Sequence, residues 1–412
     1  MGSPHRWRIA GLLACAGALN YADRAAISSV FPLLRAEFQL TDVQLGAIGT
    51  FFLWSYAACS PWAGLLADRI SRKRMVVASL AAWSAVTILT GLAQSTTQLM
   101  ITRALLGLAE CAYLPAAVGL VADHHESGSR GRALGLHMCG LNAGLIAGGA
   151  LAGYLGDAFG WRVSFWWLGG VGLLLALVCW RWLEDGPLAA NRSLDTTMRR
   201  RPIAAQLSTL LRQPAFVLLA TEAMLMAVGT WMCFNWMPLY FRETFGLSLA
   251  VAGFSGTATL QVSAVTGIAL GGMLSDRIVK RSGRRQRLVL MMACYLVAAP
   301  MLIIFTVPAS MAMVSSVIVA FSLVRGIGMA CETPALCDML PADERSTGQG
   351  LLNMLNTFAG GVGVLAAGAL KQDFGLGGVF AGVAGLIVIA SGFAWAASRK
   401  MPQATVAAPS AS

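Results

Sequence analysis

Residues 64–74 read GLLADRISRKR, an apolar segment that runs into one acidic residue and then into a dense group of bases. A shorter copy, GMLSDR at residues 272–277, follows 208 positions later and is also succeeded by bases. Apolar segments of about 20 residues cross a bilayer as helices, and loops rich in Lys and Arg remain on the cytoplasmic side. Each copy is therefore predicted to mark the point at which a membrane span enters the cytoplasm.

The whole chain has the composition of a membrane protein. Of its 412 residues, 57% are hydrophobic and only 12% are charged, about half the charged fraction of an ordinary soluble domain. Lipid offers the backbone no hydrogen bonds, so spans are helices or closed barrels, and continuous rather than alternating apolar runs favour helices. We expect an all-α membrane protein with twelve transmembrane helices, at residues 9–32, 45–67, 75–94, 98–122, 133–157, 162–183, 215–240, 250–274, 288–307, 311–333, 349–370 and 377–398.

The distribution of basic residues predicts the topology. The net charge is +11, and most Lys and Arg fall in the amino terminus, the carboxyl tail and every second loop. Only Arg35, Arg162, Arg242 and Lys371 lie on the other side. By the positive-inside rule, both termini are expected in the cytoplasm of a multi-pass inner (plasma) membrane protein. The basic charge thus indicates contact with the lipid bilayer and gives no support for a nucleic-acid partner.

The chain is predicted to consist of two related halves. The long polar connection around residues 184–214 separates two blocks of six apolar segments, and three motifs of the first block return in the second. Because six spans separate the copies, equivalent segments run in the same direction across the membrane. The expected parts are a six-helix bundle, a cytoplasmic linker, a second six-helix bundle and a cytoplasmic tail, at residues 1–184, 185–214, 215–398 and 399–412.

Several charged residues lie inside the predicted spans, where each costs about 2.5–3.5 kcal/mol and marks a functional site by default. They are Asp23, Arg24, Arg103, Glu110, Glu222, Arg325 and Glu332. On a helix, Arg24 shares a face with Tyr21, and Arg103 shares a face with Glu110 that Tyr113 continues. The alternative for each charge is an interhelical ion pair without a role in transport.

The pairing of arginines with carboxylic acids suggests a specific chemistry. A guanidinium binds carboxylate or phosphate groups in a bidentate manner, and a carboxylic acid in a low-dielectric cavity responds to both burial and a nearby arginine. A substrate anion and a proton can then compete for the same charges. Further polar residues of the spans that we expect to contact a substrate are Tyr56, His137, Asn235, Asn353 and Asn356.

The motif at residues 64–74 resembles the loop between the second and third spans of the major facilitator superfamily. The resemblance implies that this loop acts as a conformational latch in the outward-open state, through Gly64, Asp68, Arg69 and Arg72, with Asp276 and Arg277 in the second copy. Gly64 is expected to let another helix approach closely. The alternative is that the basic cluster only fixes the topology.

The segments NYADR (20–24), QLG (44–46), FLWSY (52–56) and RALLGLAE (103–110) are similar to the anion:cation symporter branch of that superfamily. The resemblance implies proton coupling at Asp23 and Glu110 and binding of the substrate anion at Arg24. The spinster-like branch of lipid carriers shares the Tyr-x-Asp-Arg and Gly-x-x-Glu patterns, so these motifs identify the superfamily better than the substrate.

The sequence therefore predicts a secondary transporter, with proton-coupled symport of a small organic anion such as a sugar acid or another carboxylate. The alternatives are a spinster-like lysolipid carrier, a proton-driven drug exporter and, less favoured, a receptor or channel. No hydrolase, Walker or metal-ligand motif occurs, so neither an enzyme, a metal nor a cofactor is expected. A monomer is expected, and Glu222, Arg325 and Glu332 have no assigned role.

Overall fold

The computed structural model describes residues 3–67, 70–186, 203–341 and 344–401, and within these ranges it contains helices and no strand. The first half of the chain forms α1 (Ser3–Ser29), α2 (Phe31–Phe38), α3 (Asp42–Ala67), α4 (Arg72–Gly91), α5 (Thr96–Glu110), α6 (Tyr113–His124), α7 (Ser127–Phe159) and α8 (Trp161–Trp182). The second half forms α10 (Ile203–Leu211), α11 (Pro214–Phe245), α12 (Leu249–Ser282), α13 (Gln286–Ala298), the 3₁₀ helix η1 (Ala299–Thr306), α14 (Met311–Met329), α15 (Glu332–Met339) and α16 (Arg345–Lys400).

These helices accommodate the twelve predicted spans. Among the described residues, nine helical segments are long and apolar enough to cross a membrane. The longest, α16 with 56 residues, is interrupted at Gly375 (φ 64°, ψ 168°), so it holds two spans in succession. Helices α1 and α3, with 27 and 26 residues, also exceed the length of about 20 residues that a bilayer requires. The predicted all-α membrane fold is confirmed.

The repeat that the sequence predicts extends to the helix starts. Thr41 and Gln44 form a reciprocal capping box at the start of α3, with the Gln44 amide donating to Thr41 Oγ1 at 3.2 Å and the Thr41 amide donating to Gln44 Oε1 at 2.9 Å. Ser248 caps α12 at the equivalent place by accepting from the Val251 amide. Such caps satisfy amide groups at the helix start that have no partner within the helix.

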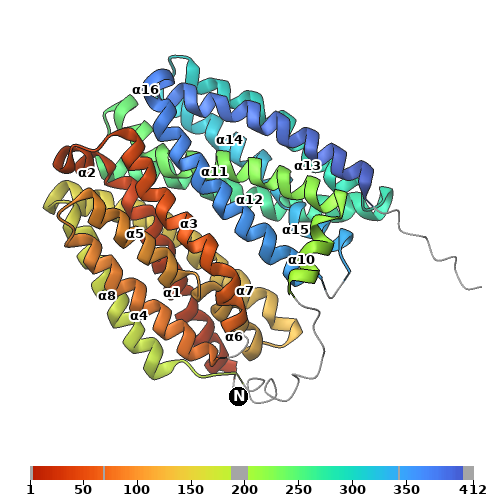
Figure 1. Cartoon of the computed structure of the whole chain (residues 1–412), viewed down its shortest axis with the longest axis horizontal. Helices are drawn as coiled ribbons and strands as arrows, with labels where there is room; N and C mark the ends of the chain where they lie inside the picture. Colours follow the sequence, from red (N-terminus) through yellow and green to blue (C-terminus); the bar gives the residue numbers. More distant parts are fainter. Residues whose placement is uncertain (1–2, 68–69, 187–202, 342–343, 402–412) are drawn as a thin grey trace, which may run out of the picture.

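Helices α1–α8 form one bundle and α10–α16 form a second bundle beside it (Figure 1). We call the end at which α1 begins and α16 finishes the terminal end, and the opposite end the distal end. The bundles contact each other through α3 against α16 and through α7 against α12. Hydrogen bonds that join α3 to α16 include those from Thr50 Oγ1 to the Gly361 carbonyl (2.9 Å) and from Trp54 Nε1 to the Phe358 carbonyl (3.1 Å).

Within the first bundle, α1 and α7 pack backbone against backbone. A Cβ atom at Gly140, Gly144 or Gly148 would lie 2.5, 1.9 or 2.3 Å from the backbone of α1. The three glycines stand one turn apart, so small residues leave a continuous contact along the helix. This contact holds the middle of α1, which carries the charged residues, in a fixed position.

The bundles separate toward the terminal end. Contacts between α7 and α12 lie toward the distal end, where Gly153 lies against Leu249 and the Leu249 amide donates to Asp157 Oδ2 at 2.7 Å. Toward the terminal end, a Cβ atom at Gly64 or Gly272 would have nothing within 4 Å. None of the described residues therefore lies against Gly64 in this conformation, and the close approach of another helix stays a prediction.

The α1–α7 contact gives a prediction about stability with a matched control on the same helix. Gly144→Ala should lower the free energy of unfolding by about 1–3 kcal/mol, because its methyl group would collide with the backbone of α1. Gly135→Ala, where nothing lies within 4 Å, should leave it unchanged or raise it by up to about 1 kcal/mol through helix propensity. Thermal unfolding of both purified variants checks this, and equal melting temperatures would contradict it.

Candidate functional site

The candidate site lies in the middle of the first bundle and is centred on an ion pair between α1 and α5. Nε of Arg24 donates to Oε2 of Glu110 at 2.8 Å, with the two side chains 8% and 0% exposed. Glu110 is the last residue of α5, and the helix is interrupted before α6 begins at Tyr113. The carboxylate therefore stands at a helix break inside a membrane span.

Aromatic rings enclose the Arg24 guanidinium. Its Cζ atom lies 4.7 Å from the ring centre of Tyr21, 5.1 Å from that of Phe52 and 4.8 Å from that of Tyr56. Ring faces attract cations, and more strongly where water is excluded. The predicted placement of Tyr21 and Arg24 on one face of α1 is thus observed, and Tyr56 joins them from α3. Phe52 also belongs to this group, although the sequence did not single it out.

Asp23 and Arg103 complete the group of charges. Asp23 is 1% exposed and accepts a long hydrogen bond of 3.4 Å from Thr87 Oγ1 on α4. Arg103 is 2% exposed, lies 5.3 Å from the Phe52 ring and interacts electrostatically with Glu110 and Asp23. Two acids and two bases thus share one buried region. Among the described contacts, Asp23 Oδ1 and Arg103 Nε have no hydrogen-bond partner, which leaves both able to bind a further polar group.

Two residues that the sequence assigns to the substrate lie elsewhere. The Tyr113 hydroxyl donates to the Leu13 carbonyl at 2.6 Å, and His137 Nδ1 lies 3.1 Å from the same carbonyl. Both side chains are buried, at 1% and 0% exposure. In this conformation these side chains join α1 to its neighbours, and their contact with a substrate stays a prediction.

The predicted contacts from the second bundle are dispersed. Asn235 is buried, and its Nδ2 donates to the Trp231 carbonyl at 3.0 Å, while its Oδ1 would lie 3.0 Å from a Cβ atom at Gly49 of α3. Asn356 Nδ2 donates to Glu332 Oε1 at 3.5 Å, and Asn353 is exposed. Of these residues, Asn235 is the one that the structure brings against the first bundle.

Two of the predicted latch residues bond within their own bundles. Arg72 Nη1 lies 2.8 Å from Asp123 Oδ2, and Asp276 pairs with Arg287 Nη2 at 3.2 Å. Arg277 is exposed, while Asp68 and Arg69 lie outside the described residues. Arg287 also pairs with Asp338, and the spacing of 51 residues equals that between Arg72 and Asp123. The pairs Arg72–Asp123 and Arg287–Asp338 are therefore equivalent ion pairs in the two halves of the chain.

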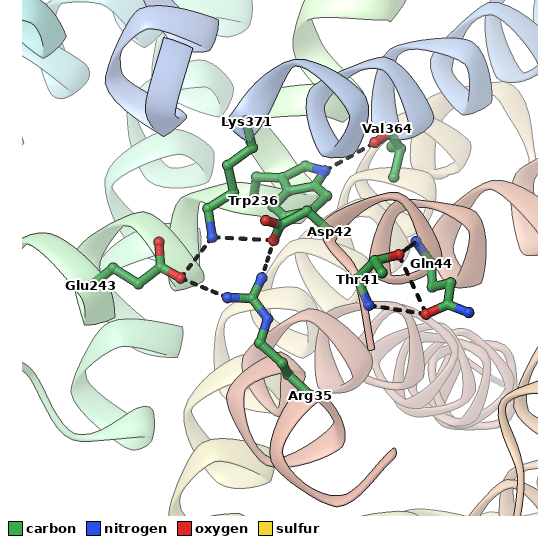
Figure 2. A network of polar contacts seen from close by, with 8 residues as sticks. All are labelled: Arg35, Thr41, Asp42, Gln44, Trp236, Glu243, Val364 and Lys371. Carbon is green, nitrogen blue, oxygen red and sulfur yellow. Dashed lines mark hydrogen bonds and ion pairs between the residues drawn. The ribbon is translucent and has the colours of Figure 1, made fainter. Parts of the chain in front are cut away.

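A network that the sequence did not predict joins the bundles at the distal end (Figure 2). Arg35 on α2 pairs with Asp42, at the start of α3, and reaches Glu243 on α11 at 3.2 Å. Lys371 on α16 lies 3.2 Å from Asp42 Oδ1 and 2.7 Å from Glu243 Oε1. Each base contacts one acid of its own bundle and one acid of the other. The only sequence signal was the placement of both bases outside the predicted cytoplasmic loops.

A further distal ion pair stays within the first bundle. Arg162 Nη2 lies 2.6 Å from Glu37 Oε1, and the indole of Trp161 donates to Glu37 at 2.7 Å. The hydrogen bond from Arg162 holds the pKa of the Glu37 carboxyl below its usual value. The carboxylate thus stays ionised at neutral pH and fixes α2 against α8.

Known proteins with similar sequences are membrane transporters. A probable sulfoacetate transporter of Cupriavidus necator is 30% identical over 68% of this chain and 66% of its own length. The hexuronate transporter of Bacillus subtilis is 24% identical over 91% of this chain and 90% of its own.

The fold also has solved counterparts. The crystal structure of a bacterial homologue of the human lysosomal transporter Spinster, in an inward-facing, unoccupied conformation, superposes with a TM-score of 0.81 at 21% identity, covering 97% of this chain and 98% of that one. The family model of the Major Facilitator Superfamily matches residues 13–364. The chain, with its helices in two bundles and its charges buried in the spans, is therefore a membrane transporter that belongs to the Major Facilitator Superfamily.

Proposed function

We propose that this transporter carries a small organic anion, such as a sugar acid or another carboxylate, together with protons. The observation that supports this proposal most strongly is the buried Arg24–Glu110 pair at 2.8 Å, with Asp23 and Arg103 beside it. The similarity to a hexuronate transporter and a probable sulfoacetate transporter supports an anionic substrate.

The geometry suggests how a proton and a substrate are coupled. Glu110 neutralises Arg24 as long as it is ionised, and the pair offers little attraction to a further anion. A proton on Glu110 removes its charge and leaves the Arg24 guanidinium, held by its aromatic rings, free to bind a carboxylate through two parallel hydrogen bonds. Release of the proton restores the ion pair and expels the anion. Asp23 is the second proton acceptor. It accepts a hydrogen bond from Thr87 and interacts electrostatically with Glu110 and Arg103.

Transport follows from the movement of the two bundles, residues 1–184 and 215–398, which act in one monomer. In this conformation the distal ends are joined by four charges and the terminal ends are not in contact at Gly64 or Gly272. The positive-inside rule assigns the terminal end, with the linker 185–214 and the tail 399–412, to the cytoplasm. The conformation is then inward-facing, and the basic loops at Asp68–Arg72 and Asp276–Arg277 latch the cytoplasmic end in the opposite state.

A spinster-like carrier of lysolipids is the second candidate. The similarity in fold to the bacterial Spinster homologue favours it, and so does the apolar surround of the charged group. A neutral lipid, however, gives no reason for two arginines beside the site, whereas the phosphate of a lysophospholipid would fit them. A proton-driven exporter of drug cations is disfavoured, because a proton on Glu110 leaves this group with an excess of positive charge.

A thermal-shift screen of the purified protein with D-glucuronate, benzoate, sulfoacetate, phosphate and lysophosphatidylcholine separates these candidates. A bound ligand raises the melting temperature by mass action, whatever its identity.

Arg24→Ala should remain folded and lose affinity for the stabilising anion by about 10- to 100-fold, as expected for a charged hydrogen-bond donor. Arg24→Lys should be intermediate, because an ammonium group lacks the planar fork. Unchanged affinity of Arg24→Ala in a tryptophan-quenching titration would refute the assignment.

Coupling is tested at the carboxylate. Glu110→Gln still accepts a hydrogen bond from Arg24 but cannot exchange a proton, so uptake driven by a pH gradient should fall at least about tenfold. Exchange of substrate across proteoliposomes without a gradient should persist. Glu37→Gln, which removes a carboxylate outside the charged group, is the control and should keep full uptake. Normal gradient-driven uptake by Glu110→Gln would exclude this residue from coupling.

The distal network gives a prediction about conformation. Lys371→Gln removes one contact to each bundle, so the closed distal end should open more often, with about 2- to 10-fold faster hydrogen exchange in residues 42–54 and 358–371. Arg162→Gln removes a base at the same end whose partner lies in its own bundle, and should leave those segments unchanged. Hydrogen–deuterium exchange with mass spectrometry measures both. Equal exchange in the two variants would show that the network does not hold the bundles together.

A further inference from the structure

A pocket in the second bundle has a single charged residue in its wall, Arg325 of α14. The pocket lies between α11, α12, α14 and α16, and its polar lining is formed by Thr230, Gln261 and Arg325. Arg325 is 7% exposed, so it is buried as deeply as Arg24, which is 8% exposed. Arg325 lies outside the charged group of the first bundle, so that group does not explain why a cation is buried in this pocket.

The partners of Arg325 are neutral. Its Nη1 donates to Thr230 Oγ1 at 3.0 Å and lies 2.9 Å from Met329 Sδ, while its Cζ is 6.0 Å from the Phe321 ring. Among the residues that the structure describes, no carboxylate forms an ion pair with it. Arg24, by contrast, is paired with Glu110 at 2.8 Å. Arg325 is therefore a buried cation whose charge the described part of the protein leaves uncompensated.

The repeat explains why this arrangement arises. Aligning Gly326 with Gly107 places Met329 at the position of Glu110, and the repeat of the first span places Thr230 at the position of Arg24. The two neutral groups that contact Arg325 are thus the counterparts of the ion pair in the first bundle. In the second bundle, Thr230 and Met329 thus occupy the positions of Arg24 and Glu110. Arg325 contacts both of them, and no acid stands at either position.

An unpaired buried guanidinium is costly in a membrane, and its remaining N–H groups form a fork that fits a carboxylate. The described bonds occupy only Nη1. We propose that Arg325 forms a second anion subsite, which binds an oxyanion group of the transported organic acid. The apolar pocket walls beside the guanidinium include Phe234, Leu260 and Phe321.

The position of the pocket connects it to the first site. Phe234, which lines the pocket, belongs to one apolar cluster with Ala25 and Leu145 of the first bundle, and Tyr21 packs against that cluster. The Tyr21 ring in turn lies 4.7 Å from Arg24. The two cations therefore lie on either side of an aromatic contact between the bundles, so that each bundle contributes one cation to the substrate path.

This inference rests on the proposed transport of an organic anion, and one pair of substitutions tests it without removing Arg325. Met329→Glu places a carboxylate beside the guanidinium and neutralises the subsite, whereas Met329→Gln has the same size and no charge. Affinities are measured by isothermal titration for benzoate, cis,cis-muconate and D-glucuronate, with benzamide as the neutral analogue of benzoate. Lysophosphatidic acid is included, because its phosphate presents the same chemistry on a lipid.

For a carboxylate that binds the wild type, Arg325→Gln and Met329→Glu should each weaken binding at least about tenfold, and Met329→Gln by less than about threefold. Arg24→Gln is measured in parallel. Wild-type affinity in Met329→Glu would overturn the subsite, and if Arg24→Gln then still loses binding, the proposed function stands without it. Loss at Arg325 with no loss at Arg24 would keep the subsite and overturn the Arg24 assignment.

The remaining outcomes are also decisive. Binding of lysophosphatidic acid alone, lost in Met329→Glu, would keep an anion subsite at Arg325 and overturn transport of small organic acids. If none of the anions binds the wild type, or if benzamide binds as tightly as benzoate, both the subsite and the anion transport are refuted. Size-exclusion profiles and melting temperatures of all variants show whether each is folded.

Discussion

The absence of hydrogen-bonding partners in the hydrocarbon core of a membrane determines most of this structure. It makes every span a helix, because only a helix satisfies its own backbone. It also makes each buried charge expensive, so that a carboxylate and a guanidinium at mid-membrane depth must neutralise each other or a ligand. The Arg24–Glu110 pair meets this requirement with two charges from one bundle. The requirement also makes the pair useful, because whatever changes the charge of one member changes what the other can bind.

The two bundles share a scaffold but differ in chemistry. Helix caps recur at Thr41 and Ser248, and ion pairs with the same spacing recur at Arg72–Asp123 and Arg287–Asp338. These features lie at helix ends, where they set the lengths and positions of the spans. The mid-membrane residues have diverged, since the first bundle brings two acids and two bases together, whereas Arg325 of the second bundle bonds to the neutral Thr230 and Met329. Duplication has thus kept the parts that fold and has varied the parts that bind.

The elements that follow a local pattern could be predicted from the sequence. Hydrophobic length located the spans, and helical spacing brought Arg24 to Tyr21. The substrate contacts predicted for Tyr113 and His137 stay predictions, because both side chains bond to the Leu13 carbonyl, a backbone group that no side-chain pattern reveals. The sequence offered no means of finding the distal network, in which Asp42 and Lys371 are 329 residues apart. Contacts at that separation depend on how the two bundles meet, and no local periodicity encodes this.

The partial exposure of the distal network determines how it responds to salt. Arg35 and Glu243 are 33% and 39% exposed, so their pairing takes place in contact with solvent. Ions at physiological concentration screen charges over about 8 Å, and more concentrated salt weakens partly exposed pairs further. Because two bases each contact two acids, the closure loses strength gradually instead of failing at a single bond. The salt concentration is therefore expected to control in a graded way how readily the distal ends of the two bundles separate.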